Sequence, residues 1–186
     1  MHVISLLTLG VFTAAAAAVD YRTGHIPNSL AFALAGLGAV LGVGGAVEHA
    51  RDTGQSIASA LGMVGAAAAL GVALCTAVPF VLYRARAMGG GDVKLLGAVG
   101  ATAGPMLGLE IELTAFVVAA LFVGCRLAYR GQLLRLLANT LSVATNLFGP
   151  RGRRRKVPEE LLTSLRFAPA VFAATLLSIV AHWRAP

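Results

Sequence analysis

Long apolar runs, separated by short polar or charged segments, make up most of the chain. A helix of about 20 apolar residues is long enough to cross the hydrocarbon core of a bilayer. The pattern therefore predicts an all-α, polytopic membrane protein, organised as a single domain over residues 1–186. Six transmembrane helices are expected, at residues 3–19, 29–47, 56–83, 93–109, 111–129 and 165–183.

Three of these runs depart from a plain span. The first ends in a row of alanines, as a signal peptide can, but no basic residue precedes it and Arg22 follows it. We expect a retained first span, with a cleaved signal peptide as the alternative. The third run is longer than a crossing needs, which predicts tilt or an extension past the membrane. The fourth is short and is broken by Gly97, Gly100, Gly104 and Pro105.

Residues 132–147 show a different pattern, with polar side chains recurring every three or four positions. That period marks one face of a helix, and leucines and valines fill the other face. We predict an interfacial amphipathic helix on the inner membrane surface, followed by a basic cytoplasmic loop at 150–160. A seventh span is the alternative, but it would move the basic run 151–156 to the outside.

Composition agrees with a membrane protein and excludes an ordinary soluble domain. Hydrophobic residues make up 58% of the chain and charged residues 12%, and the mean hydropathy is +0.80. A soluble domain has about 25% charged residues. Cys75 and Cys125 each lie inside an apolar run, without a CxxC pair or a Cys/His cluster. The sequence therefore predicts no disulfide framework, no metal site and no cofactor.

The net charge of +7 indicates topology rather than nucleic-acid binding. With the N-terminus outside, 13 of the 15 basic residues fall in cytoplasmic segments, as the positive-inside rule requires. The basic run 151–156 is expected to contact anionic lipid headgroups, and no nucleic-acid partner is expected. The exterior then holds Arg51 and Arg184, with the acidic residues Glu48, Asp52, Glu110 and Glu112 nearby.

Small residues crowd the predicted spans, as in Gly38-x-x-x-Gly42, Gly100-x-x-x-Gly104 and the alanine-glycine stretch from Gly62 to Gly71. Such patterns let membrane helices approach closely. In a chain with several spans we expect them to serve packing within the chain, with dimerisation as the alternative.

Two acidic residues, Asp20 and Asp92, lie where apolar runs meet the predicted cytoplasmic face. Asp20 begins the segment 20–28, which we interpret as a tight cytoplasmic turn because Pro27 cannot continue the first helix. Asn28 or Ser29 can cap the second helix. Asp92 lies in the first turn of the fourth helix. Ionisable groups in or near hydrocarbon are costly and indicate function. Either acid alone could be an interfacial residue or a helix cap, but the pair predicts a shared site.

The segment Gly89-Gly90-Gly91-Asp92-Val93-Lys94-Leu95 resembles the GxGD signature of the intramembrane aspartic peptidases, in the version found in prepilin peptidases. Asp20, followed by Ile26-Pro27-Asn28, resembles the first catalytic segment of the same family. The order of the two segments and the predicted spans also match, so the resemblance covers nearly the whole chain. Prepilin peptidase (type IV leader peptidase) is therefore the expected family.

The resemblance implies a membrane aspartic endopeptidase in which Asp20 and Asp92 are catalytic and no metal or cofactor takes part. It also implies a motif and substrate-approach region. The three glycines are expected to let an extended peptide lie against the backbone, because they have no side chains. Lys94 is expected either to act on Asp92 or to bind headgroups. The residues of this region are Gly89, Gly90, Gly91, Lys94, Ile26, Pro27 and Asn28.

The implied substrates are prepilins or pseudopilins, whose short basic leader is cut after a glycine at the cytoplasmic face of the bacterial inner membrane. No cysteine-containing domain is inserted between the first two segments, so the chain resembles the short, peptidase-only branch found in tight-adherence (Flp) pilus systems.

Two rival hypotheses are a proton-coupled membrane transporter and a non-catalytic assembly subunit of a pilus or secretion machine. Against the transporter, no acidic residue is expected in the middle of a span.

Overall fold

The computed structural model describes residues 3–85, 87–129 and 166–183. Within these ranges the chain is helical and contains no strand. The predicted interfacial helix at 132–147 and the basic loop at 150–160 lie outside the described residues. The helices are α1 (Val3–Thr23), α2 (Asn28–Thr53), α3 (Ile57–Arg84), α4 (Gly90–Ala103), α5 (Pro105–Tyr129) and α7 (Ala168–Trp183).

The all-helical, multi-pass prediction is confirmed, but six separate spans are not supported. Four helical stretches of the described chain are long and apolar enough to cross a membrane: Ile4–Thr23, Asn28–Thr53, Ile57–Arg84 and Gly90–Arg126. The last of these combines α4 and α5. At 14 and 16 residues, α4 and α7 are shorter than the others. At 1.5 Å per residue they are roughly 21 and 24 Å long, less than the bilayer core of about 30 Å.

Glycines with positive φ set two helix ends that differ from the prediction. α1 continues to Thr23 and ends at Gly24, whose φ is 67° and whose N–H donates to the Asp20 carbonyl at 2.8 Å. Asp20 is therefore in the last turn of a helix rather than in the connecting turn. α4 ends at Gly104, with φ 78°, and Pro105 begins α5. The boundary predicted near residue 110 was wrong, because proline suits the first helical position.

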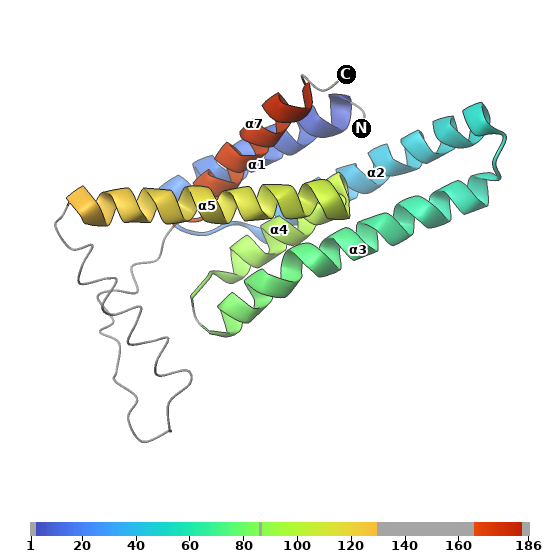
Figure 1. The fold of residues 1–186 in the computed structure, drawn as a ribbon. Coiled ribbons are helices and arrows are strands. Elements are labelled where there is room, and N and C mark those ends of the chain that lie inside the picture. Colours follow the sequence, from blue (N-terminus) through green and yellow to red (C-terminus); the bar gives the residue numbers. More distant parts are fainter. Residues whose placement is uncertain (1–2, 86, 130–165, 184–186) are drawn as a thin grey trace, which may run out of the picture.

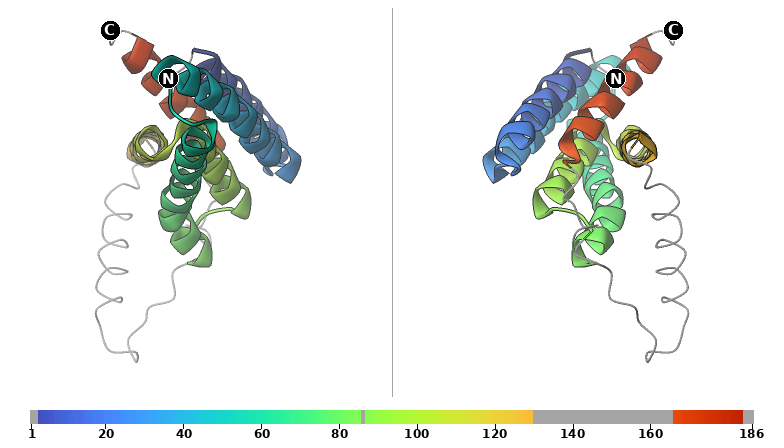
Figure 2. Two further views of the ribbon diagram at one scale, coloured as in Figure 1. Left: turned by 90° about the vertical axis from the view of Figure 1, so that its right-hand side faces the viewer. Right: turned by 90° about the vertical axis from the view of Figure 1, so that its left-hand side faces the viewer.

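The helices alternate in direction, so one end of the bundle collects the ends of α1, α3 and α5 and the starts of α2, α4 and α7 (Figure 1). α7 lies along α1, as the turned views also show (Figure 2). α2 and α3 extend together beyond the other helices (Figure 1). The segments of both sequence motifs are at the first end, because α1 ends there and α4 begins there.

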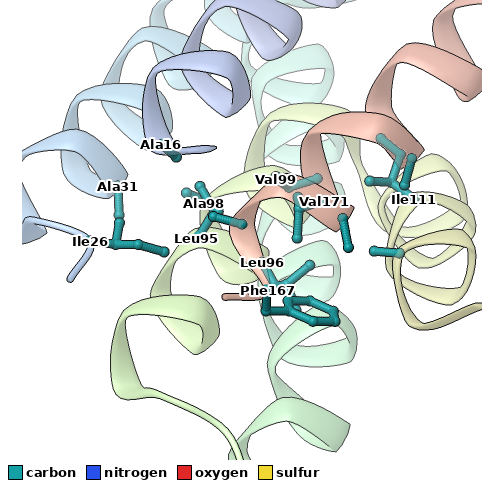
Figure 3. Packing of buried hydrophobic residues seen from close by; sticks show 14 of the residues in the cluster. Ala16, Ile26, Ala31, Leu95, Leu96, Ala98, Val99, Ile111, Phe167 and Val171 are labelled. Carbon is teal, nitrogen blue, oxygen red and sulfur yellow. The ribbon is translucent and has the colours of Figure 1, made fainter. Parts of the chain in front are cut away.

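The short helix α4 lies at the centre of the packing. Its residues Leu95 to Gly100 are all buried, and Leu95, Leu96 and Val99 contact apolar side chains from the surrounding helices (Figure 3). By contrast, many large apolar side chains on α1, α2, α3 and α5 are exposed, as a lipid-facing surface requires. α4 therefore carries its first turn on a rigid support inside the bundle.

α5 buries an acidic residue that the sequence placed at the exterior. Glu112 is 3% exposed, and the Cys75 thiol of α3 donates a hydrogen bond to its carboxyl group. Glu110, two residues earlier, accepts a hydrogen bond from Ser178 of α7 at 3.0 Å. The exterior placement was wrong for Glu112, because α5 begins at Pro105 and carries residue 112 into the bundle.

Candidate active site

Asp20 and Asp92, which are 72 positions apart in sequence, line one cavity of about 230 Å³ at the motif end of the bundle. The two side chains are 6% and 9% exposed, and they are close enough to interact electrostatically. Burying acidic groups is costly, and two of them at one cavity are rare without a function. The cavity is lined by Asp20, Gly24, His25, Ile26, Asn28, Tyr83, Gly89, Gly90, Gly91, Asp92 and Lys94.

Asp92 is held by the start of its own helix. Gly89 is the N-cap of α4, so Asp92 is the third helical residue. At that position an acidic side chain can reach back toward the N-cap N–H, and the Asp92 carboxylate does lie against the backbone of Gly89. The helix dipole favours the anion there. The alternative that Asp92 is the helix cap was wrong, because Gly89 is the N-cap residue and Asp92 lies within the first turn.

Asp20 is held from outside its own helix. The backbone N–H of Ala168, the first residue of α7, lies beside the Asp20 carboxylate. Two basic side chains, Arg166 and His25, lie near enough for their charge to act on that carboxylate. The second carboxylate oxygen, Oδ2, is buried and has no hydrogen-bond partner in the described part of the chain.

The triple glycine brings segments of this chain close to one another. A Cβ at Gly91 would lie 3.0 Å from Cβ of Ile26, and one at Gly90 would lie 3.3 Å from the ring of Tyr83. A Cβ at Gly89 would lie 3.2 Å from Oδ2 of Asp92. The sequence predicted that these glycines make room for a substrate backbone. They line the cavity, but their immediate neighbours are the connection after α1, the end of α3 and Asp92.

Lys94 and Asn28 join the two motif segments directly. The Nζ of Lys94 donates to Oδ1 of Asn28 at 2.7 Å, across 66 positions of sequence. Pro27 is the N-cap residue of α2 and no side chain caps that helix, so the predicted cap at Asn28 or Ser29 was wrong. The Asn28 side chain instead contacts Lys94, while Ile26 is buried at 4% exposure against Gly91.

Sequence reasoning missed Tyr83 and Arg166 as residues of this region. Tyr83 lies in the last turn of α3 and lines the cavity beside Gly90. Arg166 lies 146 positions after Asp20, and the basic charge before the last apolar run indicated only topology. Neither position carries a local motif, so only the tertiary contacts place these residues at the site.

Fold and site together define a multi-pass helical membrane protein with a buried pair of aspartates at one end. The chain belongs to the type IV leader peptidase family, whose profile matches residues 7–124. The match includes Asp20, Asp92 and the glycine motif, and it confirms the family expected from the motifs. No curated protein and no solved structure matches the chain. Membership gives the general class of function, a leader peptidase acting at a membrane on prepilin-type substrates.

Proposed function

We propose that the chain is an aspartic endopeptidase that removes the short basic leader of Flp-like prepilins or pseudopilins. The observation that carries this proposal is the cavity shared by Asp20 and Asp92, within a chain of the leader peptidase family. Asp20 and Asp92 are the catalytic residues in this proposal. The reaction needs neither a metal nor a covalent intermediate.

The mechanism follows from two carboxyl groups that share one proton. The charged carboxylate takes a proton from a water molecule as that water attacks the peptide carbonyl. The protonated carboxyl group donates its proton to the carbonyl oxygen, which gives the tetrahedral intermediate. The carboxyl group that took the proton of water then gives it to the amide nitrogen. The C–N bond breaks, the hydroxyl proton of the intermediate returns to the other carboxylate, and the new acid and amine ends leave. The titration belongs to the pair, so the roles of base and acid are not assigned to Asp20 and Asp92 separately.

We further propose that the cavity faces the cytoplasm of a bacterium and that the N-terminus is outside. The cavity end of the bundle holds Arg22 at the end of α1 and Arg84 at the end of α3. The far end of α2 holds Glu48 and Asp52. This distribution supports the positive-inside orientation. A cavity at that face would let the basic leader stay in water while the apolar helix of the substrate stays in the bilayer.

The transporter and assembly-subunit hypotheses predict no cleavage. Glu112 removes part of the sequence argument against a transporter, because it is an acidic residue buried within the bundle. It does not line the cavity of Asp20 and Asp92, so it adds no acidic group to that site.

A cleavage assay with purified protein and a candidate prepilin in detergent distinguishes the three hypotheses. Mass spectrometry should find a product cut after the leader glycine, and an intact prepilin would contradict the proposal.

Chelation gives a further prediction. Because two carboxyl groups carry the proposed reaction, EDTA or 1,10-phenanthroline should leave the initial cleavage rate unchanged within about twofold. The measurement is prepilin cleavage by the detergent-purified protein, with and without chelator. Loss of activity on chelation, restored by added divalent metal, would indicate a metal-dependent mechanism instead.

Gly91→Ala should lower the cleavage rate by roughly tenfold while the protein still accumulates in the membrane. The added Cβ would lie 3.0 Å from Cβ of Ile26, which is buried, so the connection after α1 has to move by a few tenths of an ångström. That connection and the first turn of α4 both line the cavity. Gly44→Ala is the control, because a Cβ there meets nothing within 4 Å. An unchanged rate for Gly91→Ala would show that the close approach does not matter to the site.

A further inference from the structure

We propose that Arg166 and the first turn of α7 position Asp20 for the reaction. This inference rests on the proposed function. The segment lies beyond residues 7–124, which the family profile matches, so the family motifs do not include it. It concerns one of the two carboxylates and the structure that orients it.

The first contact is made by the backbone at the start of α7. Ala168 is the first residue of α7, and its N–H lies beside the Asp20 carboxylate. The first N–H groups of a helix have no partner within the helix, and the helix dipole favours a negative charge at that end. The start of α7 therefore supplies a ready donor to a buried carboxylate that its own helix leaves without one.

The second contact is made by Arg166, two residues before Ala168. One guanidinium nitrogen, Nη1, donates to the backbone carbonyl of Tyr21, which directly follows Asp20. The same guanidinium lies over the Tyr21 ring, 5.4 Å from its centroid. The carbonyls in the last turn of a helix lack partners within the helix, and a cation is favourable there. Arg166 thus holds the last turn of α1 and brings positive charge near Asp20.

The start of α7 is itself rigidly placed. Phe167 is buried, and its ring lies 5.1 Å from that of Phe116 on α5. Ala168 and Val171 are fully buried against the core. The donor is therefore anchored by packing that does not involve Asp20, as a positioning group must be.

These contacts surround a carboxylate that still has an oxygen without a protein partner. Oδ2 of Asp20 is buried and has no hydrogen-bond partner among the described residues. Such an oxygen is available to exchange a proton with water or substrate, and its placement by Arg166 and the start of α7 determines how fast that exchange occurs.

The test compares Arg166→Gln with the wild type in kinetics on purified prepilin. We expect kcat to fall by about tenfold while KM stays within about twofold, because orientation of the carboxylate acts on the chemical step. Arg166→Lys keeps the charge and one donor, so it should recover part of kcat. Arg126→Gln is the matched control. Arg126 lies at the same end of the bundle and lines a cavity with Arg166, but it has no contact with Asp20.

An unchanged kcat for Arg166→Gln would overturn the inference. A fall in folded protein with full activity per folded molecule would also overturn it, since that result means a structural role alone.

If Arg166→Gln does not accumulate, the Tyr21→Leu variant tests the same inference. Tyr21 is 70% exposed, and losing its ring should lower kcat about threefold. If the wild type itself does not cleave, the proposed function fails. If the wild type cleaves and both variants match it, only the positioning role fails.

Discussion

Asp92→Asn and Asp20→Asn should each lower the kcat of prepilin cleavage by about 10²- to 10⁴-fold. Asparagine keeps the shape of the side chain but can neither accept a proton from water nor share one with its partner. Both carboxyl groups line the same cavity and interact electrostatically, so removal of either leaves a site that cannot complete the proton transfers. The measurement is the cleavage rate of purified prepilin by each variant.

The control is Asp52→Asn, which changes an exposed acid at the far end of α2 in the same way. It should cleave at the wild-type rate. Membrane abundance and melting in detergent should be equal for all three variants, since asparagine fits the space of either aspartate. If Asp20→Asn or Asp92→Asn processes prepilin normally while inserting normally, the aspartic mechanism is wrong.

Gly100→Ala and Gly71→Ala should each destabilise the folded protein by roughly 3 kcal/mol. A Cβ on Gly100 would overlap the Gly71 carbonyl and would lie 2.9 Å from Cβ of Cys75. A Cβ on Gly71 would overlap the Gly100 carbonyl in turn. The obstructing atoms are mostly backbone, which cannot rotate away as a long side chain can. α3 and α4 would have to separate, so thermal melting in detergent and membrane abundance should both fall.

Gly65→Ala is the matched control for this pair. It lies on α3, six residues before Gly71, and a Cβ there meets nothing within 4 Å. Alanine in a helix is intrinsically better than glycine, so Gly65→Ala should melt at or slightly above the wild-type temperature. Equal melting of Gly100→Ala and Gly65→Ala would show that α3 and α4 are less closely packed than the structure indicates.

The close approach of Gly71 and Gly100 illustrates how much of the helix packing could be predicted from the sequence. Repeated small residues predicted tight helix packing within the chain, and Gly100 does meet another glycine. The partner is Gly71 of α3, at the end of the alanine-glycine stretch that the sequence also singled out. A spacing pattern states which face of one helix is small, but it does not say which other helix lies against that face.

The same division holds for helix ends. Apolar runs located α3 and the start of α2 to within one residue, because the bilayer sets a minimum length of apolar sequence. The end of α2 was misplaced, since the helix continues past the predicted end at residue 47 to Thr53. The break between α4 and α5 was misplaced, although Gly104 and Pro105 were both recognised as interruptions. The adjacent apolar stretch outweighed them in the prediction. Only the positive φ of Gly104 shows that the chain turns there, and this turn is what carries Glu112 into the interior.

By itself, the sequence determined the class of this protein and the two aspartates of its candidate site. Apolar run length, the bias of basic residues and the two short motifs are all local properties. Local properties can be recognised in a sequence without knowledge of the fold. The tertiary structure alone decided what surrounds those aspartates. α7 places the N–H of Ala168 beside the Asp20 carboxylate, and Ile26 packs closely against Gly91 of the triple glycine. Such contacts join segments far apart in the chain, so no local pattern encodes them.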